Sequence, residues 1–277
     1  MDFVDSLPKQ RPFGLTLRPE AWWLQPLVVF LGFSAFIVYS TWAAFQGLND
    51  ARTGVPTYWY GGGGANYLSP FYSPEFWGVS PHSIGRLPGW WPGWLPFSPA
   101  FLILWAPAGF RFTCYYYRGA YYKSFWADPA NCAVGEPRKA YWGERYFPLI
   151  FQNLHRYFFY LAALFIVLLS YDAWNSLWFK DAVGQKHFGV GVGTMVLALN
   201  AVFLALYTFG CHSLRHLTGG FLDARSKAPA CARVYDCVSC LNRRHMMWAW
   251  ISLIWVGFTD IYIRLCAKGI WHDWRIF

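Results

Sequence analysis

The stretch "FGCHSLRHLTGG", residues 209–220, ends a long charge-free run and contains a cysteine and two histidines. His212 and His216 are four residues apart, so on a helix their imidazoles share one face. Gly219 and Gly220 can end such a helix without any histidine, and capping alone therefore explains the stretch poorly. The residue types predict a site that holds a metal or a haem, or that contacts a diffusible substrate.

A second stretch, "CVSCLNRRH", residues 237–245, has two cysteines at a spacing that lets both thiolates chelate one metal ion. With two histidines, Cys237 and Cys240 fit either a Cys2His2 zinc site or a [2Fe–2S] centre of Rieske type. The Rieske sequence spacing is absent from the chain, so the ligands of such a centre would come from different helices. A haem b held by one histidine from each of two helices is the competing prediction.

His155 lies about eight residues into another apolar segment, roughly 12 Å along a helix. An imidazole buried in a membrane needs partners for its ring nitrogens, which makes His155 a candidate ligand. The favoured iron–sulfur centre takes two of three histidines on one iron and two cysteines on the other. The predicted ligands are Cys237, Cys240, His155, His212 and His216, and the cysteines that could replace the first two are Cys114, Cys132 and Cys211.

Polar and aromatic residues next to these ligands predict a quinone-binding site. The residues concerned are Arg156, Arg215 and Trp248. Their side chains can hydrogen-bond a quinone carbonyl while aromatic rings line the faces of the quinone. Snorkelling arginines and an aromatic belt at the membrane surface are the alternative interpretation of the same residues.

Apolar helices must position all of these side chains. The 277 residues are 56% hydrophobic and only 13% charged, whereas soluble domains have about 25% charged residues. The net charge of +9 comes from Lys and Arg that lie mainly between the apolar segments, so topology explains it better than nucleic-acid binding does. The composition predicts an integral membrane protein.

The uncharged runs predict a single all-α domain, residues 1–277, built as a bundle of five transmembrane helices. Apolar runs of this length can satisfy their backbone in lipid only as helices. The second run is the weakest because it contains Pro99, Pro107 and Arg111, and in the last run Asp260 is expected to pair with Arg264. The predicted helices cover about 22–47, 94–114, 147–171, 188–214 and 246–264.

Loop charges predict the orientation of this bundle. Lys and Arg number five in the basic loop 115–146 and six in the basic loop 215–245, against two in the aromatic, Gly- and Pro-rich loop 48–93. The positive-inside rule therefore predicts a cytoplasmic N-terminus and an outer C-terminus, with 48–93 outside. The metal ligands then lie near the cytoplasmic face, where thiols stay reduced.

Four stretches together carry a resemblance to a known family. They are "FRFTCYYYRGAYYKSFW", "CAVGEPRKAYWGERYFPLIFQNLHRYF", "CHSLRHLTGG" and "CVSCLNRRHMMWAWISLIWVGFTDIYIRL". The combination resembles the membrane-anchor subunit of actinobacterial succinate dehydrogenase, of the mycobacterial type with one five-helix anchor, over most of residues 100–277. Residues 213–217, "SLRHL", are also similar to the segment around a haem-ligating histidine in other anchors of this enzyme family.

The resemblance implies a multi-pass plasma-membrane subunit that docks a flavoprotein and an iron–sulfur protein on its basic inner loops and passes electrons to quinone. It implies no catalytic residue for succinate oxidation in this chain. Anchors with two haems need four axial histidines, and the outer half of these helices has no histidine pair, which leaves one centre near the inner face. A zinc-stapled scaffold and a transporter are the competing function classes.

Overall fold

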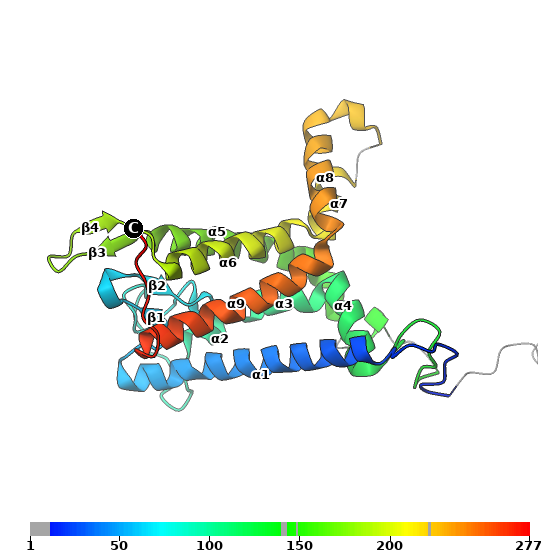
Figure 1. Cartoon of the computed structure of the whole chain (residues 1–277), viewed down its shortest axis with the longest axis horizontal. Coiled ribbons are helices and arrows are strands. Elements are labelled where there is room, and N and C mark those ends of the chain that lie inside the picture. The colour runs from blue at the N-terminus through cyan, green and yellow to red at the C-terminus, as the bar shows by residue number, and fades with distance from the viewer. Residues whose placement is uncertain (1–11, 140–142, 148, 221–222) are drawn as a thin grey trace, which may run out of the picture. The chain divides into compact units, whose positions relative to one another are not determined.

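The computed structural model describes residues 12–139, 143–147, 149–220 and 223–277, which are mostly helical (Figure 1). They form two compact units, Met1–Ala35 with Phe112–Leu154 and Phe36–Arg111 with His155–Phe277. The predicted cytoplasmic N-terminus at residues 1–11, and small parts of both predicted inner loops, lie outside the described residues.

The described chain contains nine α-helices and shorter helical turns. The α-helices are α1 Leu24–Thr53, α2 Pro99–Ile103, α3 Trp105–Thr113, α4 Tyr115–Tyr121, α5 His155–Asn175, α6 Val192–Phe209, α7 His212–Gly219, α8 Pro229–Asn242 and α9 His245–Ala267. The short turns are η2 Gly62–Gly64, η3 Pro70–Tyr72, η4 Tyr122–Trp126, η5 Gly143–Arg145, η6 Leu149–Leu154 and η7 Arg225–Lys227. Two antiparallel hairpins pair β1 Trp59–Tyr60 with β2 Tyr67–Leu68, and β3 Trp178–Lys180 with β4 Lys186–Phe188.

Four described helices are long and apolar enough to cross a membrane, and they agree with four of the five predicted segments. They are Leu24–Thr53, Leu149–Asn175, Val192–Phe209 and His245–Ala267. The helix within predicted segment 188–214 is shorter because residue 188 belongs to the β3–β4 hairpin and the helix ends at Phe209.

The remaining predicted segment, 94–114, forms two short helices. Together α2 and α3 span residues 99–113, or about 22 Å, which is less than the roughly 30 Å of a bilayer core. Pro107 explains the break, because its ring clashes with the carbonyl four residues earlier and it has no N–H to donate. The five-helix count and the orientation of the termini therefore stay predictions.

In the larger unit, α6 packs between α5 and α9, and Figure 1 shows the three helices side by side. The Trp255 indole Nε1 donates to the carbonyl of Val196 at 3.1 Å, which ties α9 to α6. The chain runs in opposite directions along α5 and α6 and turns again before α9. One end of this unit therefore gathers the start of α5, the end of α6 and the start of α9.

The opposite end of the unit contains a buried ion pair that the sequence predicts. The Arg264 guanidinium Nε lies 2.8 Å from Asp260 Oδ2, and both side chains are buried. Tyr39 donates to the same oxygen at 2.6 Å, and the Ser69 hydroxyl donates to Asp260 Oδ1. Arg264 also donates to the Thr57 hydroxyl at 3.0 Å. The carboxylate and its cation are thus satisfied entirely by protein groups.

The loop between α1 and α2 contributes to the core of this end. Tyr58 stacks on Tyr72 at a centroid distance of 3.9 Å, and both side chains are buried. The Tyr67 hydroxyl donates to Asp273 at 2.7 Å, and the Ser73 hydroxyl donates to the buried Asp172. The aromatic residues of the loop between α1 and α2 therefore contribute to the packing between the long helices as well as covering them.

The smaller unit joins the first part of α1 to the segment after α3. Phe30 lies 4.8 Å from Phe125 between ring centroids, and Phe33 lies 5.4 Å from Tyr117. The backbone of Gly135 donates to the carbonyl of Leu15 at 3.0 Å. Aromatic packing and one short backbone pairing thus define this unit.

Candidate functional site

His155 and Cys211 form the closest pair of potential metal-ligating side chains at the end where α5 begins and α6 ends. His155 Nε2 lies 2.8 Å from Cys211 Sγ. Cys211 is only 2% exposed, and His155 is half-buried. The sequence predicts His155 as a ligand and names Cys211 as a cysteine that could replace the CxxC pair.

Helix ends explain why these two side chains meet. His155 is the first residue of α5, and α6 ends at Phe209. Cys211 then adopts an extended backbone as the N-cap of α7, so the chain turns at Gly210. The stretch 209–220 is therefore a helix end, a turn and a new helix.

Asn242 and Leu241, at the end of α8, hold this turn in place. The Asn242 amide donates to the carbonyl of Gly210 at 2.8 Å, one of the carbonyls that a helix end leaves without an intrahelical partner. A Cβ at Gly210 would lie 2.7 Å from the carbonyl oxygen of Leu206 and 3.3 Å from Leu241 Cβ. The turn therefore has no room for a side chain at position 210.

A stack of rings encloses the pair. Phe110 from α3 stacks on His155 at 4.8 Å with the planes 8° apart, and it also lies 5.4 Å from Tyr207. Tyr207 in turn stacks on His245 at 5.0 Å. We call Phe110, His155, Tyr207, Cys211 and His245 the His155–Cys211 cluster.

Arg111 supplies a positive charge beside this cluster. Its guanidinium lies 4.7 Å from the centroid of the Tyr207 ring and donates to the Ser252 hydroxyl at 3.0 Å. Arg111 also donates to the carbonyl of Ala249 at 3.3 Å. It is thereby held against α9, next to the cluster.

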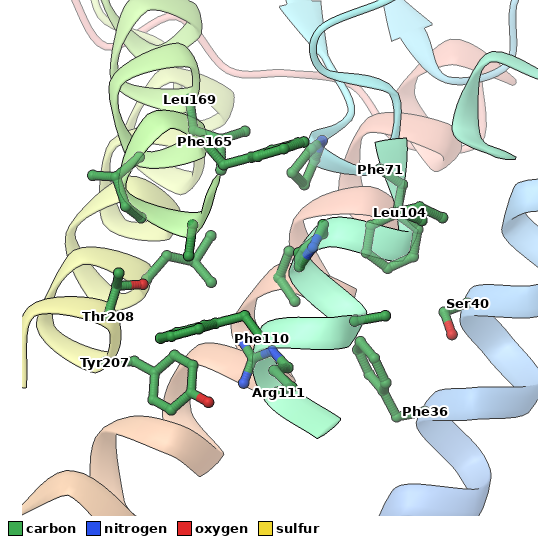
Figure 2. A pocket seen from close by; sticks show the side chains of 17 residues that line it. Phe36, Ser40, Phe71, Leu104, Phe110, Arg111, Phe165, Leu169, Tyr207 and Thr208 are labelled. Atoms are coloured by element: carbon green, nitrogen blue, oxygen red, sulfur yellow. The ribbon is translucent and has the colours of Figure 1, made fainter. Parts of the chain in front are cut away.

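A cavity of about 140 Å³ extends from the cluster between the helices (Figure 2). Phe110 and Arg111 from α3, and Tyr207 and Thr208 from α6, line one side of it, while Ser40 and other residues from α1 line another. Its walls are mostly apolar. An apolar cavity of this size holds a benzene-sized ring.

The structure brings some of the predicted residues together and separates others. His216 Nδ1 lies 3.3 Å from the Arg156 guanidinium, and both side chains are exposed. Arg215 donates to the Tyr235 hydroxyl at 2.8 Å, which joins α7 to α8. His212 is exposed and Trp248 is half-buried.

Cys237 and Cys240 lie outside the His155–Cys211 cluster. Both are free, exposed thiols on α8, which projects from the bundle in Figure 1. Within the described ranges, no group of three or more His, Cys, Asp and Glu side chains is arranged to hold a metal ion. The part of the chain that the structure describes thus provides a thiol–imidazole pair and no complete four-ligand set.

Sequence reasoning missed Tyr207, Gly210 and Asn242 as parts of this site. Gly210 lies within the stretch 209–220 and Tyr207 two residues before it, while Asn242 lies between "CVSC" and His245. Their roles depend on which helix ends meet, which the spacing of residues along the chain does not specify.

These features define a multi-pass membrane protein in which a buried thiol meets a half-buried imidazole beside an apolar cavity. The chain belongs to the family described as actinobacterial succinate dehydrogenase subunit SdhC, whose sequence model matches residues 24–269. The resemblance inferred from the sequence is confirmed, and the chain is a multi-pass protein of the plasma membrane.

A solved structure agrees with this family. The chain is similar to one from the Mycobacterium smegmatis Sdh1 complex in the apo form, with 42% identity and a TM-score of 0.80. The similarity covers 97% of this chain and 96% of that chain. No curated protein matches the sequence.

Proposed function

We propose that this chain anchors succinate dehydrogenase in the membrane and passes electrons from the soluble subunits to quinone through a redox centre at the His155–Cys211 cluster. The observation that carries the proposal is the 2.8 Å approach of the buried Cys211 thiol to the His155 imidazole. The flavoprotein and iron–sulfur subunits are its partners, and succinate is oxidised there. In this proposal the chain carries the electrons from the soluble subunits to quinone in the membrane.

The donor types at the cluster fit a Rieske-type [2Fe–2S] centre better than they fit a haem. Such a centre takes two thiolates and two imidazoles, whereas a haem b takes two imidazoles and would leave Cys211 without a role. His155 and Cys211 supply one donor of each kind. When bound, the centre carries single electrons at a potential that histidine ligation raises.

The second imidazole of the proposed set is His245. It stacks on Tyr207, and its Nδ1 would lie 3.5 Å from a Cβ at Gly210, the residue before Cys211. The second thiolate is drawn from Cys114, which is buried, or from the predicted Cys237 and Cys240, which are exposed.

The cavity beside the cluster is the proposed site of the quinone ring. Its walls are apolar, as quinone requires, and Arg111 offers guanidinium N–H groups next to it. This places the acceptor within the bundle, while the predicted Arg156, Arg215 and Trp248 lie toward the surface at the same end. Those three side chains are proposed to line the approach to the cavity.

The predicted basic inner loops are proposed as the docking surface for the soluble subunits. Arg233, Arg243 and Arg244 are exposed along α8 and just beyond it. Cationic side chains on this arm suit a partner surface that carries acidic groups, and complementary charge speeds association. In the proposed topology this arm is cytoplasmic and the chain crosses the membrane five times.

Electron paramagnetic resonance of the purified complex tests the centre. Histidine nitrogens on a reduced [2Fe–2S] centre give hyperfine couplings that all-cysteine clusters lack, so the signal is separable from those of the iron–sulfur subunit. His155→Ala and Cys211→Ser should each abolish it. Each should also lower the rate of quinone reduction by succinate at least about tenfold. Substituting residues around a metal site already lowers activity by about that factor, and loss of a ligand should cost no less.

The matched control is His212→Ala, since His212 is an exposed imidazole of the same stretch. It should retain both the couplings and the activity. Loss of the couplings in this control, or their survival in Cys211→Ser, would contradict the proposed ligands. If the complex has a Soret absorption band that disappears in His155→Ala, the centre is a haem and not an iron–sulfur cluster. If metal analysis finds zinc in this chain and no redox signal can be assigned to the chain, both redox centres are excluded.

A further inference from the structure

The CxxC motif on α8 has no partner in the buried site, and its two thiols are free and exposed. We propose that Cys237 and Cys240 are a modification site at which a peroxide converts the two thiols to a reversible disulfide. The proposal rests on the proposed function in two respects: the second thiolate of the redox centre comes from another cysteine, and the docked soluble subunits leave Cys237 and Cys240 open to solvent.

Helix geometry brings the two cysteines within reach of each other. Both lie inside the single helix Pro229–Asn242, three residues apart. With a radius of about 2.3 Å and a rise of about 1.5 Å per residue, their Cα atoms are roughly 5 Å apart. Disulfides join Cα atoms that are about 4.4–6.8 Å apart, so the backbone already satisfies the first requirement.

The side chains need a small adjustment. Residues three apart on a helix have Cβ atoms about 5–6 Å apart, whereas a disulfide brings them to about 3.5–4.5 Å. Closing the bond therefore tightens the last turn of α8 by about 1 Å. Strained and exposed disulfides are the more easily reduced ones, which makes the bond reversible by cellular thiols.

One peroxide molecule is the only oxidant that the formation of the disulfide requires. One thiolate attacks a peroxide oxygen, the O–O bond breaks, and the cysteine becomes a sulfenic acid as the first water or alcohol leaves. The second thiolate attacks that sulfur, the S–S bond forms, and the sulfenic oxygen leaves as water. Two thiols lose two electrons and two protons, and one peroxide is reduced.

The position of the motif connects it to the buried site. Leu241 and Asn242 follow Cys240 directly, and they are the residues that hold the turn at Gly210. Tightening of the Cys237–Cys240 turn therefore acts on the residue next to Cys211. Val238, the residue after Cys237, is buried, so α8 packs against its neighbours on another face and leaves the two thiols exposed.

The test is mass spectrometry of the purified complex after treatment with hydrogen peroxide. Wild-type chain should lose about 2 Da, the mass of the two hydrogens removed, and should recover it with dithiothreitol. Peptide mapping should place the bond between residues 237 and 240. Cys237→Ser and Cys240→Ser should each prevent this loss.

Cys132→Ser is the matched control, because Cys132 is an exposed cysteine in another part of the chain. It should lose the same mass as the wild type. A second measurement needs no oxidant: phenylarsine oxide bridges two close thiols and should bind the wild type and Cys132→Ser but neither Cys237→Ser nor Cys240→Ser. Failure of the arsenical to bind, or a disulfide that persists in Cys240→Ser, would overturn the proposal.

Discussion

The two ends of the helical bundle in the larger unit bury polar side chains in opposite ways. At one end, Asp260 accepts hydrogen bonds from Tyr39, Ser69 and Arg264, so charge and hydrogen-bonding capacity are matched. At the other end, a thiol and an imidazole approach each other beneath aromatic rings. The first arrangement is complete without any ligand, and the second consists of groups whose chemistry lies in binding metals.

This difference is the reason that a functional role is proposed for the second group of side chains and a structural role for the first. Intramembrane ionisable residues are functional candidates by default, yet complete satisfaction by protein groups is what a structural role requires. At the His155–Cys211 cluster, aromatic rings stack on both histidines, Phe110 on His155 and Tyr207 on His245. Substitutions at the two ends should therefore affect different properties.

The largest expected effect comes from Arg264→Ala. It leaves the buried Asp260 carboxylate without its cation, and breaking a buried ion pair costs about 3–5 kcal/mol. The purified complex should unfold at a clearly lower temperature. The electron paramagnetic resonance signal with histidine couplings (below, the resonance) should stay unchanged in the protein that remains folded.

Arg52→Ala is the control for this substitution, because Arg52 is an exposed arginine near the same end. Its unfolding temperature should stay at the wild-type value. If Arg264→Ala lost the resonance and kept its stability, the structural role assigned to the Asp260–Arg264 pair would be wrong.

An intermediate effect is expected for Gly210→Ala. The new Cβ would press on the Leu206 carbonyl at 2.7 Å and on Leu241, and overpacking of this kind costs about 1–3 kcal/mol. Because Gly210 precedes Cys211, the resonance should change in shape as well. Spectra and unfolding curves of the same preparation measure both effects.

Gly89→Ala serves as the comparison, since a Cβ at Gly89 would meet no atom within 4 Å. It should change neither the resonance nor the unfolding temperature. A Gly210→Ala protein with a wild-type spectrum would show that the turn does not shape the site.

The smallest effect concerns His82, in the loop between α1 and α2. Burial lowers the pKa of its imidazole below the ordinary value of 6.5, so the folded protein favours the neutral ring. The unfolded chain binds the proton more readily, and the stability contributed by neutral His82 is present at higher pH and decreases as the pH falls below about 6.5.

His82→Gln removes the titration and keeps a group that can bond to Asn66, which lies 2.6 Å from the imidazole Nε2. When the pH is lowered from 7.5 to 5.5, the unfolding temperature of the wild type should therefore decrease more than that of His82→Gln. A difference that stays constant with pH would remove His82 from the titrating groups.

Much of the fold could be predicted from the sequence because lipid restricts the choices. Apolar runs of sufficient length located four helices, and the i,i+4 spacing of Asp260 and Arg264 predicted their ion pair. The second predicted helix was less secure for a reason visible in the sequence, since Pro107 interrupts it. What the runs did not reveal is that Tyr58, Tyr67 and Tyr72 would enter the core.

Two residues of the His155–Cys211 cluster were named from the sequence, and the assignment of a site to them stays a prediction. His155 was identified because a histidine in an apolar run is costly, and Cys211 was named as a replacement ligand. The preference for Cys237 and Cys240 came from spacing along the chain, which identifies groups able to chelate together. Spacing does not say whether a helix carries those groups into the bundle or away from it, and here α8 projects outward.

The hydrogen bond from Ser69 to Asp260 has a consequence for biosynthesis. The two residues are 191 positions apart, and Tyr67 and Asp273 are 206 apart. A growing chain therefore inserts its first helix long before the partners of the following loop have been translated. During that interval the serine and tyrosine hydroxyls lack their carboxylate partners, and synthesis of the last helix and the residues after it completes this end of the bundle. Translation that stops before Asp260 therefore leaves both hydroxyls without their native carboxylate partners.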